Sequence, residues 1–199
     1  MDSMIPQRAN TTWDIDKIIT RSLDIPVNSL RKITDIVRSV EFPKGHLLFR
    51  GGKVEHDMYF LAKGIAHAYY YHEANKVTLC FNSEGDALIS LKSYIQHQPG
   101  YEHIELLEPC KLYHLKTASL YELYNSDIHI ANWGRKLAEL ELIKAEEQLM
   151  SKLFKTASER YQELIQKQPS LLQRVPLGTI ASYLGISQVT LSRIRAEVR

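Results

Sequence analysis

The chain has 199 residues, which is enough for one large domain or for two smaller domains with separate hydrophobic cores. Hydrophobic residues make up 44% and charged residues 24%, as is typical of globular proteins, and no apolar run approaches the roughly 18 residues that span a membrane. The start of the chain lacks the pattern of a secretory signal, and two cysteines, Cys80 and Cys110, exclude a disulfide framework, so we expect reduced thiols and a cytoplasmic location.

The net charge of +2 conceals a difference between the two ends of the chain. Residues 151–199 contain eight Lys or Arg and three Asp or Glu, a net charge of +5. Residues 1–150 contain 17 basic and 20 acidic residues, a net charge of −3. A basic C-terminal fifth on a mildly acidic body favours contact with a polyanion, although a solvated basic surface would have the same composition.

Two short helices are expected first, over residues 14–19 and 28–37. The second has apolar residues at the helical spacing, and Asn28 is its expected N-cap. From Val40 the pattern changes to short apolar runs separated by Pro and Gly, which predicts strands in 41–52, 58–71, 76–81, 105–108 and 111–115. Short strands with regular turn signals are typical of an all-β barrel or roll of about 80 residues.

After Thr117 the helical period returns. A short helix is predicted over 119–124 and a long one over 128–154, which at 1.5 Å per residue would be about 40 Å in length. Its apolar residues form two stripes, and so long a helix exceeds what one small roll covers, so we expect part of it to pack against a second copy. Packing within one chain is the alternative. Residues 157–199 are predicted to be helical, with a break at 168–170.

The strongest local pattern is a helix-turn-helix over residues 177–194. Two helices that cross on a short turn need a small residue at the crossing, a residue tolerant of unusual backbone angles in the turn, and apolar residues between them. Ala181 meets the first need and Gly185 the second, and Ser187 is the expected N-cap of the second helix. The apolar contacts are expected from Ile180, Leu184, Ile186, Leu191 and Ile194.

The second helix of this pair is expected to enter the major groove of DNA with its N-terminal residues. Gln188, Val189, Ser192 and Arg193 lie on or near its outward face; a Gln amide pairs with adenine, and an Arg reaches guanine or phosphate. Thr190, Arg195 and Arg199 are better placed for phosphates. A helical hairpin that packs in the same way without DNA is the competing interpretation.

The order of these parts resembles the Crp/Fnr family of transcription regulators, from about Val27 to Ile194. The resemblance is carried by motifs at 42–45, 51–52, 59–64, 84–86, 159–161, 174–176, 181–187 and 190–195, which include Phe-Pro-Lys-Gly, Glu-Gly-Asp, Glu-Arg-Tyr and Arg-Val-Pro. It implies an α+β protein with a cyclic nucleotide-binding-like sensor domain over residues 1–127. A dimerisation helix over 128–154 and a helix-turn-helix domain over 155–199 would follow.

The family resemblance also implies partners and site residues. It implies a homodimer that binds a near-palindromic DNA site, RNA polymerase as a further partner, and a small-molecule effector in the β-roll. Gln188, Val189 and Ser192 would face bases, and Ser187, Thr190 and Arg193 would contact the backbone or bases. The chain stops at Arg199, just past the recognition helix, so a full wing is not expected.

The effector site departs from that of family members that bind cyclic AMP, which hold the phosphate with an Arg-Ser pair. Tyr101 and Glu102 stand where that pair would fall, and Glu102 would repel a phosphate. The other candidate pocket residues are Ile89, Ser90, Leu91 and Lys92 after the Gly-Asp turn, and Ile143 and Lys144 on the long helix. We therefore predict a degenerate pocket without tight binding of cyclic AMP. The cysteine cluster of oxygen-sensing members is missing, and we expect no cofactor.

The sequence contains no phosphate-binding glycine loop, no His-Glu-x-x-His and no nucleophile elbow, so we do not expect an enzyme. His97 and His103, with Glu102 and Glu105, could collect a metal, but ordinary surface histidines explain them better. The leading interpretation is a sequence-specific DNA-binding regulator. The alternative is a small-molecule sensor that acts through protein contacts and whose helix-turn-helix does not bind DNA.

Overall fold

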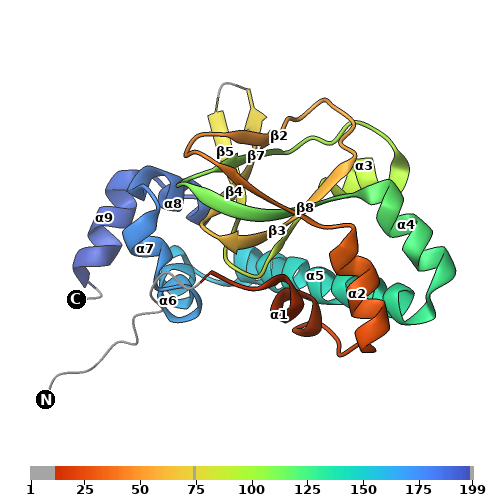
Figure 1. Ribbon diagram of the computed structural model, residues 1–199. Helices are drawn as coiled ribbons and strands as arrows, with labels where there is room; N and C mark the ends of the chain where they lie inside the picture. Colours follow the sequence, from red (N-terminus) through yellow and green to blue (C-terminus); the bar gives the residue numbers. More distant parts are fainter. Residues whose placement is uncertain (1–11, 74, 198–199) are drawn as a thin grey trace, which may run out of the picture.

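The computed structural model describes residues 12–73 and 75–197, and it begins with two short helices packed against the rest of the chain (Figure 1). Helix α1 is Ile15–Thr20, and the Asp14 side chain accepts a hydrogen bond from the Asp16 amide at its N-terminus. Helix α2 is Val27–Asp35. The prediction of Asn28 as the N-cap of α2 is wrong. Pro26 occupies that position, because its fixed φ and missing N–H suit the start of a helix.

Two four-stranded antiparallel sheets form the predicted β-roll. The first has the order β1-β8-β3-β6 and consists of Arg38–Phe42, Cys110–Lys116, Asp57–Lys63 and Ala87–Leu88. The second has the order β2-β7-β4-β5 and consists of Leu47–Phe49, His103–Leu106, Ala66–His72 and Asn75–Asn82. Strand β7 begins two residues before the predicted range and ends at Leu106, so Leu107 and Glu108 belong to the turn that follows it.

Apolar side chains from the inner faces of both sheets fill the roll. Ile104 and Leu106 of β7 are buried inside the roll. His103 and Glu105, which alternate with them along the strand, are only partly buried, as strand alternation requires. Nine residues form this buried cluster: Phe49, Leu61, Ala66, Ala68, Leu88, Ile104, Leu106, Cys110 and Leu112. The roll is thus a packed β-sandwich in the part of the chain that the structure describes.

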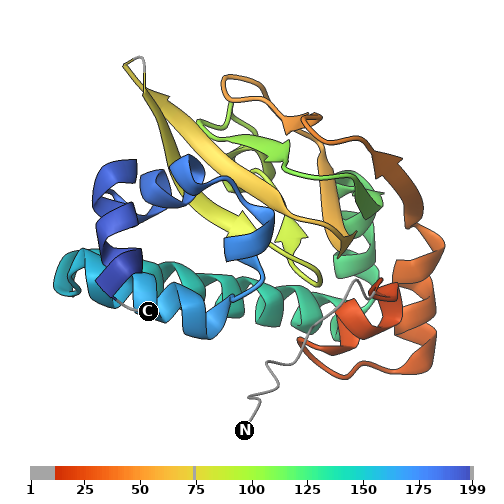
Figure 2. The same cartoon turned by 90° about the vertical axis from the view of Figure 1, so that its left-hand side faces the viewer.

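Three helices follow or interrupt the roll. The short helix α3, Leu91–Gln96, lies between β6 and β7 and was not predicted. Helix α4 is Thr117–Ser126, and α5 is Ile128–Phe154, the predicted long helix with Asp127 as its N-cap. Figure 2 shows α5 running beneath the roll. Its first half is buried there through Ile130 and Trp133, whereas its second half has no buried residue.

Four helices form the last part of the chain that the structure describes. Helix α6 is Ala157–Lys167, α7 is Leu171–Arg174, α8 is Leu177–Leu184 and α9 is Gln188–Glu197. Helix α6 turns back beside α5, since Lys167 Nζ lies 3.0 Å from Glu147 Oε2 and Ser151 donates to Glu163 at 2.7 Å. The break predicted at 168–170 is confirmed. None of the described helices is long and apolar enough to cross a membrane.

Candidate nucleic-acid interface

The turn between α8 and α9 has the geometry that the sequence predicts for a helix-turn-helix. Gly185 ends α8 with φ +67°, a left-handed conformation that costs glycine little. The Gly185 amide donates to Ser182 O at 3.1 Å, and the Ile186 amide donates to Ala181 O at 3.0 Å. Ala181 is 2% exposed, and it belongs to the same buried cluster as Leu191 and Ile194 of α9. Both residues therefore do what their positions in the motif predict.

A hydroxyl caps the second helix of the pair. The Thr190 amide donates to Ser187 Oγ at 3.1 Å, which confirms Ser187 as the N-cap of α9. The hydroxyls of Ser187 and Thr190 also lie 2.9 Å apart. Ser192 Oγ donates to Gln188 O at 3.0 Å, so its proton is used within the helix and its oxygen is left free to accept.

The apolar contacts that hold the pair together belong to a larger core. Ile180, Leu184, Leu191 and Ile194 are buried, as predicted, and Ile186 packs against them while remaining partly exposed. The same cluster includes residues of α6 and α7 and two residues of the roll: Tyr161, Leu164, Leu171, Val175, Ile65 and Phe81. The helix-turn-helix is thus packed against the roll of its own chain.

Glu159 and Arg160, which in the sequence are only markers of the family resemblance, support the motif. Glu159 and Thr156 form a capping box at the start of α6, with Glu159 Oε2 accepting from the Thr156 amide at 2.7 Å. Arg160 donates through Nη2 to Leu184 O at 2.8 Å, which satisfies a free carbonyl at the end of α8. No local pattern in α8 indicates this contact, because its donor lies 24 residues earlier.

The outward side of α9 presents the predicted DNA-binding residues to solvent. Val189 is 63% exposed and Arg195 is partly buried. The remaining members of the predicted set are all exposed, namely Ser187, Gln188, Thr190, Ser192 and Arg193. Helix α9 lies on the far side of α8 from the roll (Figure 1). Arg199 lies outside the described residues. The polar and basic side of α9 is thus accessible without any movement of the chain.

The residues predicted to hold an effector lie in different surroundings. Ser90 is buried at the N-terminus of α3, and a Cβ on Gly100 would meet Ser90 Oγ on one side and Glu102 Oε1, at 3.0 Å, on the other. The structure therefore brings Ser90 and Glu102 close together. Glu102 Oε1 is shielded from solvent and has no hydrogen-bond partner among the described residues. Of the other candidates, Ile89 packs into the core around Trp133, Lys92 is partly buried, and Leu91 and Tyr101 are exposed.

The two candidates on the long helix are not part of this group. Ile143 is half exposed, and Lys144 Nζ lies 3.0 Å from Asp86 Oδ1 and 2.7 Å from Glu141 Oε1. Partial burial alone would lower the pKa of Lys144, but the two carboxylates outweigh that effect and raise it. Lys144 thus serves as an ion-pair partner that ties α5 to the turn between β5 and β6.

The second half of α5 carries a stripe of exposed apolar residues. Leu142 is 70% exposed, Leu149 56% and Phe154 73%. Ile143 and Met150 are about half exposed, and Leu153 is more than half exposed. Monomeric proteins rarely leave so much contiguous apolar surface in water. We call these six residues the α5 stripe.

This architecture is similar to that of several known proteins. The family model of the cyclic nucleotide-binding domain matches residues 39–127. FixK2 from Bradyrhizobium japonicum superposes with a TM-score of 0.69 at 17% identity, over 82% of this chain and 84% of FixK2. CLP from Xanthomonas campestris, a c-di-GMP responsive global regulator, superposes with a TM-score of 0.68 at 14% identity, over 87% and 91% of the two chains.

The catabolite activator protein of Thermus thermophilus also superposes, with a TM-score of 0.56 at 17% identity, over 88% of this chain and 84% of that protein. The chain has the Crp/Fnr fold. Its roll, over residues 39–127, is similar to the cyclic nucleotide-binding domain. No curated protein sequence is significantly similar to this chain.

Proposed function

We propose that this Crp/Fnr-type protein is a homodimeric, sequence-specific DNA-binding transcription regulator rather than an enzyme. The proposal rests chiefly on one observation: a braced helix-turn-helix presents the polar and basic side of α9 to solvent. Residues 1–127 would be the sensor, 128–154 the dimerisation helix and 155–199 the DNA-binding part. RNA polymerase at the regulated promoter is a further proposed partner.

The residues of α9 divide into two proposed roles. Gln188, Val189 and Ser192 would face bases, and because the Ser192 proton is already donated to Gln188 O, Ser192 would accept from an amino group of adenine or cytosine. Ser187, Thr190, Arg193 and Arg195 would contact phosphates or guanine. The net charge of +5 in residues 151–199 supports this division, because phosphate contacts supply most of the affinity for DNA.

Arg193→Ala should weaken binding to a selected duplex by about 1–3 kcal/mol, because it removes one charge-assisted contact. The duplex would be obtained by selection from genomic fragments and the affinity measured by fluorescence anisotropy at several salt concentrations. Lys17→Ala is the matched control, since it removes the same charge from the exposed surface of α1. Affinity of the unchanged protein should fall steeply with salt. If no fragment binds, or if the affinity does not depend on salt concentration, the proposal is wrong. The alternative, a small-molecule sensor that acts through protein contacts, would then be favoured.

Calorimetric titration with cyclic AMP should show no binding in the micromolar range. A phosphate that entered beside Ser90 would meet the shielded carboxylate oxygen of Glu102, which has no hydrogen-bond partner among the described residues. Cyclic GMP and cyclic di-GMP serve as parallel arms, the latter because the similar protein CLP responds to c-di-GMP. Micromolar binding of cyclic AMP would show that the pocket is not degenerate.

A further inference from the structure

The turn between β5 and β6, residues 83–86, presents two carboxylates to two different parts of the chain. Glu84 Oε1 accepts from Arg174 Nη2 of α7 at 2.6 Å, and Glu84 Oε2 accepts from Nη1 at 3.3 Å. Asp86 Oδ1 accepts from Lys144 Nζ of α5 at 3.0 Å. The turn itself is closed by Asp86, whose Oδ2 accepts from the Ser83 amide at 2.8 Å. One short turn therefore holds both the long helix and the segment that leads into α8.

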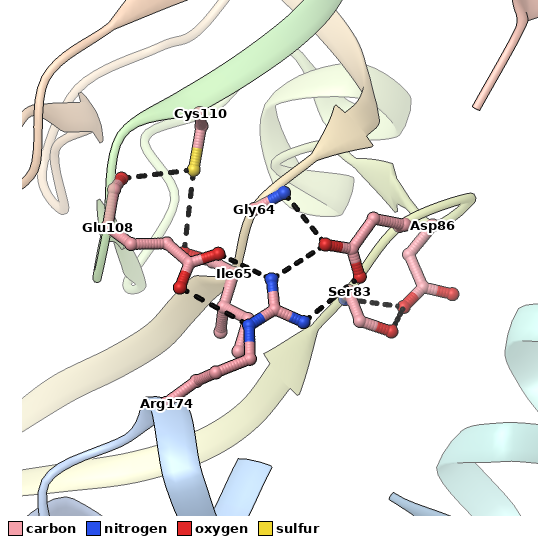
Figure 3. Close-up of polar contacts among 8 residues, drawn as sticks. Gly64, Ile65, Ser83, Asp86, Glu108, Cys110 and Arg174 are labelled. Carbon is pink, nitrogen blue, oxygen red and sulfur yellow. Dashed lines mark hydrogen bonds and ion pairs between the residues drawn. The ribbon is translucent and has the colours of Figure 1, made fainter. Parts of the chain in front are cut away.

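Arg174 is held from a second side by Glu108, in the turn between β7 and β8 (Figure 3). Its Nε donates to Glu108 Oε2 at 3.2 Å, and its Nη2 pairs with Glu108 Oε1. Glu84 Oε1 also accepts from the amide of Gly64, in a third turn, at 2.9 Å. The guanidinium thus joins α7 to the end of the roll at which three turns meet, with the fork geometry that a lysine lacks.

The electrostatics of this cluster favour a stable pairing. Burial alone would raise the pKa of Glu84, but Arg174 and the Gly64 amide outweigh it and hold that pKa below its ordinary value. Burial would likewise lower the pKa of Arg174, yet the two carboxylates raise it. All three charged side chains are partly buried, so water screens them less than a surface pair. We call Arg174, Glu84 and Glu108 the Arg174 clamp.

A second contact lies on the open edge of the roll. Strand β5 is an edge strand, and an edge leaves backbone groups without a strand partner. Ser182 of α8 fills part of that edge, because its Oγ accepts from the Thr78 amide at 3.0 Å and donates to Lys76 O at 3.1 Å. Beside it, the rings of Tyr183 and Phe81 lie 5.2 Å apart. Helix α8 is thus docked on β5.

We propose that Arg174 is a positioning residue for DNA binding: through the turn 83–86 it holds α8 and α9 at one fixed orientation relative to α5. This proposal rests on the proposed function. In a dimer joined through α5, the angle between α5 and α9 sets the distance between the two recognition helices, and that distance must match one turn of DNA. The turn continues directly into β6 and then into Ile89 and Ser90, so a ligand that moved this segment would act on the same clamp.

The clamp is tested first without DNA, by hydrogen exchange on residues 1–199 as the proposed dimer. Arg174→Gln should speed exchange of the Thr78 amide by at least about tenfold, because the docked α8 protects it through Ser182. Exchange in β8, residues 110–116, serves as the internal reference and should not change. Arg135→Gln is the matched control, since it breaks a guanidinium–carboxylate pair with Glu139 that lies within α5 and joins no two parts of the chain.

The second measurement compares DNA affinity for a full palindrome with affinity for a single half-site. Arg174→Gln should weaken binding to the palindrome by at least about tenfold and leave half-site binding nearly unchanged, since only the spacing of the two α9 helices is lost. Arg174→Lys keeps the charge without the fork. Its affinity for the palindrome should therefore lie between that of the unchanged protein and that of Arg174→Gln. Equal loss on both duplexes, with faster exchange in β8 as well, would show a merely structural role and overturn the proposal.

Unchanged exchange at Thr78 in Arg174→Gln would also overturn the proposal, whatever the DNA result. If the unchanged protein binds no duplex while Thr78 exchange accelerates as expected, the proposed DNA function and the spacing role of Arg174 both fail. The hydrogen-exchange result would then still establish that the clamp holds α8 on the roll. The two measurements thus separate a failure of the clamp from a failure of the proposed function.

Discussion

Replacing Leu142 and Leu149 by glutamate should weaken the proposed dimer by at least about a hundredfold. The two side chains are 70% and 56% exposed in one chain and stand seven residues apart on one side of α5. Burial of a leucine side chain contributes about 1.5–3 kcal/mol, and a symmetric interface counts each position twice. Four buried carboxylates without partners would add a desolvation cost to that loss. Sedimentation velocity over a range of concentrations measures the result.

The matched control for this change is Ile95→Glu. Ile95 is 65% exposed on α3, away from α5, so the same kind of substitution there should leave the dimer intact. DNA binding provides the second test, because a monomer engages only one half of a palindrome and loses the advantage of linked sites. If the unchanged chain sediments as a monomer at micromolar concentration, or the double variant remains dimeric, the α5 stripe is not the dimer interface.

Local patterns in the sequence predict the elements that depend on neighbouring residues. The bounds of α5 agree with the prediction because Asp127 caps its start and its apolar residues recur at the helical spacing. The helix-turn-helix agrees because Ala181, Gly185 and Ser187 each meet a steric or hydrogen-bonding need within a few residues. In both cases the information lies within the segment itself.

Other local features are harder to predict, because two rules compete or the segment is short. Asn28 is a good N-cap by residue type, but Pro26 starts the helix two residues earlier, so Asn28 lies inside α2. Helix α3 has only six residues, too few to show a helical period, and Ser90 at its N-terminus makes no side-chain cap bond. The family resemblance alone drew attention to this segment, through the cyclic nucleotide site.

The docking of the helix-turn-helix on the roll cannot be predicted from sequence patterns. Arg174 meets Glu84 and Glu108 across 90 and 66 residues, and Ser182 meets Thr78 across 104 residues. Periodicity and capping rules describe neighbours a few positions apart and contain no information about such pairs. Arg174 appeared in the sequence only as part of an Arg-Val-Pro motif. Its role depends on where three turns of the roll meet, which only the folded chain determines.

Trp133→Ala should lower the free energy of unfolding by about 3–5 kcal/mol, the range for removal of a large aromatic side chain from a core. Trp133 is fully buried where α5 meets the roll and the N-terminal helices, 6.1 Å from the Phe60 ring. Its Nε1 donates to Ile19 O at 3.0 Å, a buried hydrogen bond. Urea unfolding monitored by circular dichroism measures the change.

Two companion variants divide that loss into its physical parts. Trp133→Phe retains most of the apolar contact but leaves Ile19 O without its donor, so it should cost about 1–3 kcal/mol. Ile95→Ala, at an exposed position outside the α5 stripe, should change the free energy of unfolding by no more than about 0.5 kcal/mol. If Trp133→Ala costs as little as Ile95→Ala, the first half of α5 is not anchored on the roll. Because the proposed dimer and the proposed placement of α9 on DNA both need a fixed α5, Trp133→Ala should also weaken binding to a palindromic duplex.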